Sequence, residues 1–158
     1  MAETHTNNAD FIAVQNEDFC LAAEYAKLCE NNSSDGAVVT FTGLVRDLNQ
    51  GQRITSLTLE HYPAMTEKAL REIVHDARNR WQLGRVRVIH RVGKLALSEQ
   101  IVFVGISARH RGDAFAACEF IMDYLKTRAP FWKKEQTENG EHWVEAKASD
   151  QQKAQQWK

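Results

Sequence analysis

The alternation of strand-like and helix-like segments restricts the fold of this chain most strongly. Residues 85–92, RVRVIHRV, alternate cations with apolar side chains, and residues 101–108, IVFVGISA, are almost uniformly apolar. The first pattern predicts a strand with one solvated face, and the second predicts a buried strand. Both lie between two long helical segments. Strand pairs separated by helices favour a single α+β domain with a mixed or antiparallel sheet over a doubly wound parallel sheet.

Other segments carry equally clear signals. We expect helices over 19–29, 65–83 and about 113–128, strands over 36–46 and 54–62, and a hairpin over 131–146. Pro63 suits the first turn of the second helix, and Gly84 is expected to end that helix. Pro130 ends the third helix, because a residue before proline avoids helical geometry. The dipeptide Asn139-Gly140 predicts the hairpin turn.

Length and charge balance define the class of protein. The chain has 158 residues, 43% of them hydrophobic, which suits one globular domain. We expect a flexible N-terminus over 1–10, a single domain over 11–150 and a polar tail over 151–158. Lys and Arg number 20 against 21 Asp and Glu, so no global basic field favours nucleic acid. No segment approaches the roughly 20 apolar residues that cross a bilayer, and we expect a soluble, cytoplasmic protein without a membrane partner.

Missing motifs exclude several kinds of site. The glycines form neither a phosphate loop nor a dinucleotide-binding turn, and no serine lies in a G-x-S-x-G elbow. The six histidines lack metal-binding spacing, so we expect no metal and no bound cofactor. Cys20, Cys29 and Cys118 lack C-x-x-C spacing. We expect them to be small core residues, and neither disulfide partners nor zinc ligands.

The segment YLKTRAPFWKKE, 124–135, sets cations among bulky apolar residues. One reading is surface cover, with lysine stems on apolar neighbours and ammonium groups in water. The other is a pocket. Lys126 falls in the last helical turn, where the helix dipole favours a cation. Lys133 shares a strand face with apolar residues, where burial lowers the pKa of an amine and suits it to acid–base or nucleophilic chemistry.

The hairpin register decides which lysine faces the apolar side. A two-residue turn at the Asn-Gly dipeptide pairs Lys133 with Ala146 and Lys134 with Glu145. Lys134 then lies on the opposite face of the strand. We expect it to be a surface ion-pair partner with at most a supporting part in binding.

Three further cations complete a candidate anion site. Arg46 ends the first predicted strand. His110 and Arg111 precede the third helix, whose unpaired N–H groups and positive end attract anions. Each has a simpler reading too, with Arg111 in solvent and His110 packed at a strand end. The candidate set is Arg46, His110, Arg111, Lys126 and Lys133.

Five segments of the chain resemble one known family. They are GAVVTFTGLVR, LTLEHYPAMTEKAL, IVFVGISARHR, FIMDYLKTRAPFWKKE and WVEAKASDQQ, in this order from about Gly36 onward. They resemble the large, catalytic subunit of molybdopterin synthase, an enzyme of molybdenum cofactor biosynthesis. The resemblance implies an α/β-hammerhead type fold, a homodimer core and a catalytic domain over 11–150. One small ubiquitin-like sulfur-carrier subunit on each large subunit would make a heterotetramer.

The resemblance also implies a reaction and a site. Members of this family are sulfurtransferases that move sulfur from the carrier's C-terminal Gly-Gly thiocarboxylate to cyclic pyranopterin monophosphate (precursor Z), forming the dithiolene of molybdopterin. The positions that match the family's motifs imply these substrate-binding residues: Arg46, His110, Arg111, Lys126, Lys133 and, in a supporting role, Lys134. Lys126 and Lys133 are the catalytic pair, and Lys126 resembles the lysine nearest the carrier's terminal glycine.

Two differences and two rival functions remain. Leu44 stands where relatives can carry Lys, and Lys147 stands where relatives can carry Arg. One alternative is a non-catalytic binding module, which would bind the tail of a ubiquitin-like carrier on the FWKKE hairpin and catalyse no reaction. An RNA-binding α+β domain is disfavoured by the net charge of -1 and by the lack of a base-stacking motif.

Overall fold

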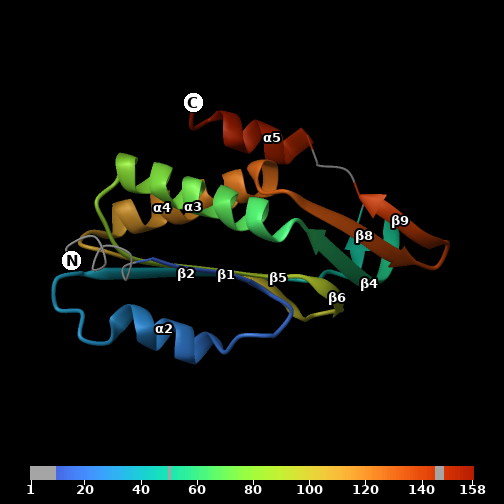
Figure 1. Cartoon of the computed structure of the whole chain (residues 1–158), viewed down its shortest axis with the longest axis horizontal. Coiled ribbons are helices and arrows are strands. Elements are labelled where there is room, and N and C mark those ends of the chain that lie inside the picture. Colours follow the sequence, from blue (N-terminus) through green and yellow to red (C-terminus); the bar gives the residue numbers. More distant parts are fainter. Residues whose placement is uncertain (1–9, 50, 145–147) are drawn as a thin grey trace.

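The computed structural model describes residues 10–49, 51–144 and 148–158. These residues form two β-sheets and four α-helices in an α+β arrangement (Figure 1). The predicted fold class is therefore confirmed, whereas the predicted flexible segment 1–10 falls, apart from Asp10, outside the described residues. Among the described helices, none is both long and apolar enough to cross a bilayer.

The first sheet has four strands in the order β1-β5-β7-β2. They are β1 (Asp10–Gln15), β5 (Leu83–Arg91), β7 (Gln100–Ala108) and β2 (Ala37–Leu44). β1 runs parallel to β5, and the other neighbours are antiparallel. Helix α2 (Leu21–Cys29) covers one face, and α3 (Pro63–Arg80) and α4 (Arg111–Arg128) cover the other (Figure 1). Sequence reasoning missed β1, an edge strand whose apolar run, residues 11–14, is only four residues long.

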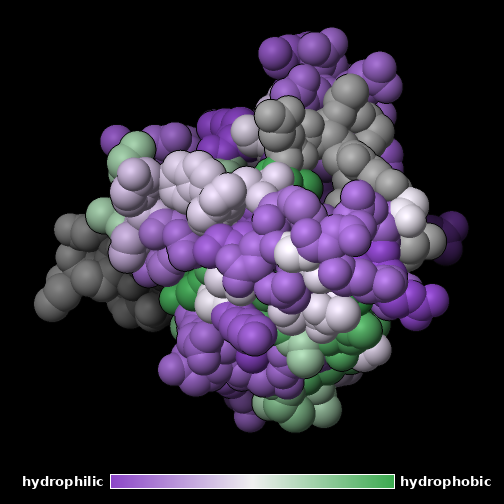
Figure 2. All heavy atoms as spheres, turned by 90° about the vertical axis from the view of Figure 1, so that its right-hand side faces the viewer, coloured by the Kyte–Doolittle hydropathy of each residue, from purple (hydrophilic) through white to green (hydrophobic). Residues whose placement is uncertain are grey.

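The second sheet lies beyond the C-terminal end of α4 (Figure 1). Its strands are β3 (Leu48–Asn49), β4 (Gln52–His61), β8 (Phe131–Thr137) and β9 (Gly140–Val144), with β6 (Gly93–Ala96) also paired to β4. Figure 2 looks onto this end of the molecule, where hydrophilic residues cover most of the surface and hydrophobic patches lie between them. Helix α5 (Ala148–Gln155) packs over α4.

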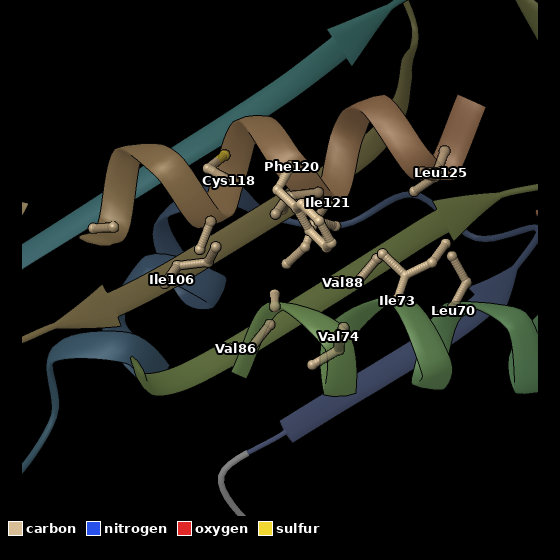
Figure 3. Packing of buried hydrophobic residues seen from close by; sticks show 14 of the residues in the cluster. Leu70, Ile73, Val74, Val86, Val88, Ile106, Cys118, Phe120, Ile121 and Leu125 are labelled. Atoms are coloured by element: carbon tan, nitrogen blue, oxygen red, sulfur yellow. The ribbon is translucent and has the colours of Figure 1, made fainter. Parts of the chain in front are cut away.

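The main core lies between the first sheet and the pair α3 and α4. Figure 3 shows Phe120 and Ile121 of α4 and Ile73 of α3 gathered over Val86 and Val88 of β5, and each of these five side chains is at most 1% exposed. Burying a large aliphatic or aromatic side chain stabilises a fold by about 1.5–3 kcal/mol, so this cluster holds α4 firmly on the sheet. The position of α4 in turn sets the position of Lys126 in its last turn.

The predicted solvated face of residues 85–92 is wrong, because α2 covers it. Arg87 forms an ion pair with Glu24 of α2, with 2.8 Å between Nη2 and Oε1. Arg85 donates from Nη1 to the carbonyls of Lys27 and Glu30, at 2.9 and 2.6 Å, where the helix ends with unpaired acceptors. The alternating cations therefore fasten a helix to the sheet instead of facing water.

The prediction that Gly84 ends the preceding helix is also wrong. Helix α3 ends at Arg80, with Trp81 as its C-terminal cap, and Gly84 lies inside β5. A Cβ atom at Gly84 would collide with the Asp35 carboxylate and the Ser107 hydroxyl, which are hydrogen-bonded to each other at 2.7 Å. Glycine is required there for a close approach between loop and strand rather than for a helix end.

The segment predicted to be a polar tail contributes α5 and a docked C-terminal end. Asp123 of α4 is only 9% exposed and accepts hydrogen bonds from Trp157 Nε1 at 2.8 Å and Gln156 Nε2 at 3.1 Å. The Trp157 ring meets the rings of Trp81 and Phe120 edge to face, with centroids 5.5 Å apart in both pairs. This contact holds α5 over α4.

Replacing the Asp123 carboxylate tests this attachment. We expect Asp123→Ala to lower the free energy of unfolding by about 1–3 kcal/mol, because it leaves the partly buried indole N–H of Trp157 without an acceptor. Chemical denaturation measures the change. Gln156→Ala is the control, since it removes an exposed donor and leaves the indole contact in place. Equal stability of Asp123→Ala and the wild type would contradict this role.

Candidate active site

A cavity of about 260 Å³ lies where the first sheet, the end of α4 and the second sheet meet. Its walls include apolar side chains of all three parts, among them Val102 of β7, Leu125 of α4 and Leu59 of β4. Three cations line it as well: Arg46, Lys126 and Lys133. The structure thus brings together three of the five candidate residues, from three separate parts of the chain.

Arg46 reaches the cavity from the connection that follows β2. The strand ends at Leu44, two residues earlier than predicted, and both Leu44 and Arg46 are exposed at the cavity wall. Leu44 is 54% exposed. Its apolar side chain lies at one of the two positions where the sequence differs from the family that it resembles. The other difference, Lys147, lies outside the described residues.

Lys126 reaches the cavity from the last turn of α4. Met122, one turn earlier, lines the cavity too, as the predicted helical row requires. Phe115, the first member of that row, does not line it and is 63% exposed near the other end of the helix. The carbonyl of Pro130, just after the helix, accepts a hydrogen bond from Thr66 Oγ1 at 3.1 Å, which ties this end of the helix to α3.

Lys133 reaches the cavity from β8, although the predicted hairpin register is wrong by two residues. Thr137 pairs with Gly140, so Glu138 and Asn139 form the turn and Lys133 lies opposite Val144. Gly140 has a φ of 108°, which favours glycine and explains why it follows the turn residues. A shift of two residues leaves every side chain on its predicted face, and Lys133 therefore still faces the cavity.

Lys134 lies on the opposite face of β8. Its Nζ is 3.5 Å from Glu141 Oε2 and 4.9 Å from the centre of the Trp143 ring. The expected surface ion pair exists with Glu141, and the predicted partner Glu145 lies outside the described residues. Lys134 does not line the cavity.

His110 and Arg111 lie at the opposite end of α4 from the cavity. His110 is the N-terminal cap of the helix and Arg111 its first residue, whereas Lys126 is fifteen residues further along. At 1.5 Å per residue, about 22 Å of helix separates Arg111 from Lys126. Both residues are exposed and neither lines the cavity of this chain.

His90 lines the cavity and was missed by sequence reasoning. It continues the apolar row of Val86 and Val88 on β5, and it is 5% exposed. Its ring stacks on that of Phe131, with centroids 3.8 Å apart and an angle of 18° between the planes. The strand alternation offered the only signal: a histidine stood where the buried face required an apolar residue.

Burial lowers the pKa of His90 to about 4. Desolvation of the imidazolium is the main cause, and the charges of Lys133, His61 and Lys126 act in the same direction. Hydrogen bonding to the Arg91 carbonyl opposes the shift without reversing it. The ring is therefore neutral at neutral pH.

The cysteines take no part in the cavity. Cys118 is buried, as predicted, and desolvation raises the pKa of its thiol to about 12. The core prediction is wrong for Cys20 and Cys29, which lie exposed beside the two ends of α2, where the helix turns its outer side to solvent. Within the described part of the chain, no group of three or more His, Cys, Asp and Glu side chains could hold a metal ion.

Comparison with known proteins identifies the family. The sequence profile described as "MoaE protein" matches residues 14–128. The chain is 59% identical over 157 residues to the molybdopterin synthase catalytic subunit of Escherichia coli, covering 99% of this chain and 100% of that protein. The chain belongs to the MoaE family. The resemblance noted in the sequence is thereby confirmed.

Solved structures of MoaE proteins and of a distant relative share the fold. The molybdopterin biosynthesis MoaE protein of Burkholderia ambifaria matches with a TM-score of 0.80 and 51% identity, over 94% of this chain and 97% of that one. A Helicobacter pylori structure described as a complex of subunits 1 and 2 of molybdopterin-converting factor matches with a TM-score of 0.69. At 20% identity, over 87% of this chain and 90% of that one, this second match supports the fold alone.

The lowered pKa of His90 predicts a defined acid sensitivity. Between pH 6.5 and about 4 the unfolded chain binds a proton at this residue and the folded chain does not. The free energy of unfolding should therefore decrease as the pH is lowered across this window, by up to about 3 kcal/mol. Urea denaturation at several pH values measures this change. The free energy of unfolding should depend less steeply on pH in His90→Phe, because this variant keeps an aromatic ring against Phe131 and has no group to titrate at this position. If the free energy of unfolding depends on pH in the same way in the wild type and in His90→Phe, His90 is not a buried neutral histidine.

Proposed function

We propose that this chain is the catalytic subunit of molybdopterin synthase and transfers sulfur from a thiocarboxylated carrier to cyclic pyranopterin monophosphate. Membership of the MoaE family supports the reaction. The observation that carries the assignment to this cavity is the meeting of Arg46, Lys126 and Lys133 around one apolar space. A monophosphate needs fixed cations, and a ring system needs apolar walls. A cytoplasmic location stays a prediction from the sequence.

The proposed chemistry uses the cations for charge rather than for covalent bonds. The carrier's thiocarboxylate sulfur forms a C–S bond to a substrate carbon while a C–O bond of that carbon breaks, giving an acyl thioester, and the departing oxygen takes up a proton. When water attacks the acyl carbon, a C–O bond forms, the C–S bond breaks and the sulfur stays on the substrate. Lys126 and Lys133 stabilise the oxyanion of that step and exchange protons with the sulfur and water, while Arg46 holds the phosphate.

The sulfur source explains why no cysteine lines the cavity. A nucleophilic cysteine needs an accessible thiolate, and the buried Cys118 thiol has its pKa raised to about 12. In the proposed reaction the nucleophilic sulfur arrives on the partner protein, so the cavity requires no thiol of its own. We propose a small ubiquitin-like carrier with a Gly-Gly terminus as that partner, which accords with the two-subunit complex of the Helicobacter relative.

Removing either cavity lysine should stop the chemistry and leave the fold intact. We expect Lys126→Ala and Lys133→Ala to slow dithiolene formation from thiocarboxylated carrier and substrate by about 100-fold or more, because each removes a charge from the developing oxyanion. Single-turnover assays measure the rate. Lys68→Ala, an exposed lysine of α3, is the control and should match the wild type. Carrier binding without product in the wild type would instead indicate a non-catalytic binding module.

We infer further that the chain acts as a homodimer in which the second copy supplies His110 and Arg111. About 22 Å of helix separates these residues from Lys126 in one chain, so they cannot enter the same cavity. If they bind substrate, as their motif implies, they do so in the cavity of a partner copy. A heterotetramer with one carrier on each copy then has two equivalent composite sites.

Mixing inactive variants tests this sharing. In a dimer of Lys126→Ala with Arg111→Ala, one composite site carries both defects and the other carries neither. Random exchange of the two proteins should restore roughly a quarter of wild-type activity, because half the dimers are mixed and half of their sites are intact. Each variant alone should be inactive. No recovery on mixing, with dimers formed normally, would show that Lys126 of one copy and Arg111 of the other do not act in the same site.

A further inference from the structure

A buried hydrogen-bonding group in the cavity has no part in the chemistry above. His90 is 5% exposed and lines the cavity from β5 of the first sheet, on the face that carries the main core. Its ring lies flat against Phe131, the first residue of β8, at 3.8 Å. Two sheets therefore hold the imidazole in one orientation.

The hydrogen bonding of the ring defines its tautomer. The Nδ1 atom lies 2.8 Å from the backbone carbonyl oxygen of Arg91. A carbonyl oxygen can only accept, so Nδ1 carries the proton and donates it. In a neutral ring, Nε2 is then a bare acceptor. Within the described part of the chain, Nε2 has no hydrogen-bond partner, although burying an acceptor without one is costly.

The charges around the ring keep it an acceptor. Ionisable groups from three elements, namely Lys133 of β8, His61 of β4 and Lys126 of α4, all oppose protonation of His90. Other charged residues of the cavity wall are Arg46, Glu135 and Asp150. The carboxylates can also accept hydrogen bonds, but each cancels part of the positive charge that an anionic substrate requires. The imidazole accepts a hydrogen bond without doing so.

We propose that His90 is a substrate-binding residue whose Nε2 accepts a hydrogen bond from an N–H or O–H group of the bound substrate. This inference rests on the proposed function, since it concerns the same cavity. The cations bind the phosphate of the substrate. This single point of attachment leaves the rest of the substrate free to rotate. An acceptor on the inner wall supplies a second point. It also selects ring systems with a donor at that position, because a substrate without one leaves Nε2 buried and unpaired.

Two amide substitutions separate the acceptor from the structural hydrogen bond. An asparagine amide can reach the position of Nδ1, so His90→Asn can keep the bond to the Arg91 carbonyl while removing the acceptor at Nε2. A glutamine amide reaches the position of Nε2, so His90→Gln can restore an acceptor oxygen there. We expect kcat/KM for the pyranopterin substrate to fall about 10- to 100-fold in His90→Asn and to recover substantially in His90→Gln.

A measurement on the wild type avoids any question of folding. In protein labelled with nitrogen-15 at histidine, adding substrate should move the Nε2 resonance of His90 toward a hydrogen-bonded value and leave Nδ1 nearly unchanged. An unmoved Nε2 resonance at saturating substrate would overturn the proposal. Full activity of His90→Asn would also overturn it. The same holds if the activities of His90→Asn and His90→Gln change only in proportion to their thermal stabilities.

The outcomes separate this inference from the proposed function. A wild-type chain that neither binds nor converts the pyranopterin in the presence of thiocarboxylated carrier overturns both. Normal conversion by the wild type together with an unaffected His90→Asn variant overturns only the role of His90. Loss in His90→Asn with recovery in His90→Gln supports both.

Discussion

The packing of α4 on the first sheet is the contact on which the rest of the structure depends. Its buried residues, including Phe120, Ile121 and Leu125, pack against the side of the first sheet where β7 and β2 lie and fix the helix along its length. One end of that helix carries His110 and Arg111, and the other carries Lys126, which meets Arg46 and Lys133 at the cavity. A rigid helix thus keeps Lys126 at one cavity and holds Arg111 about 22 Å away.

The second sheet turns this scaffold into a site. Strand β8 follows α4 almost directly and pairs with β4 over seven residue pairs, so the chain that leaves the helix becomes a cavity wall. Phe131, the first residue of that wall, stacks on His90 of the first sheet. The cavity is therefore a junction between two sheets, and its shape depends on their contact rather than on either alone.

Local sequence patterns predicted most of the elements and part of the site. Alternation predicted β5, an apolar run predicted β7, helical spacing predicted α3, Pro130 predicted the end of α4, and the Asn-Gly dipeptide predicted the hairpin, because these signals depend on neighbours in the chain. Whether a face is solvated depends on what packs there, and so the cations Arg85 and Arg87 were misread until α2 was seen to cover them. His90 was missed for the same reason: only the approach of β8 makes a strand histidine part of a cavity.

The pairing of β8 with its neighbours has a consequence for how this chain can vary. Lys133 and Lys134 are adjacent and chemically identical, yet one lines the cavity and the other pairs with Glu141 on the far face. Only the strand register distinguishes them. An insertion or deletion of a single residue before Lys133 that slid β8 along β4 would exchange their faces without altering either lysine. Evolution can therefore lose this site by a change of length alone, with both lysines still present in the sequence.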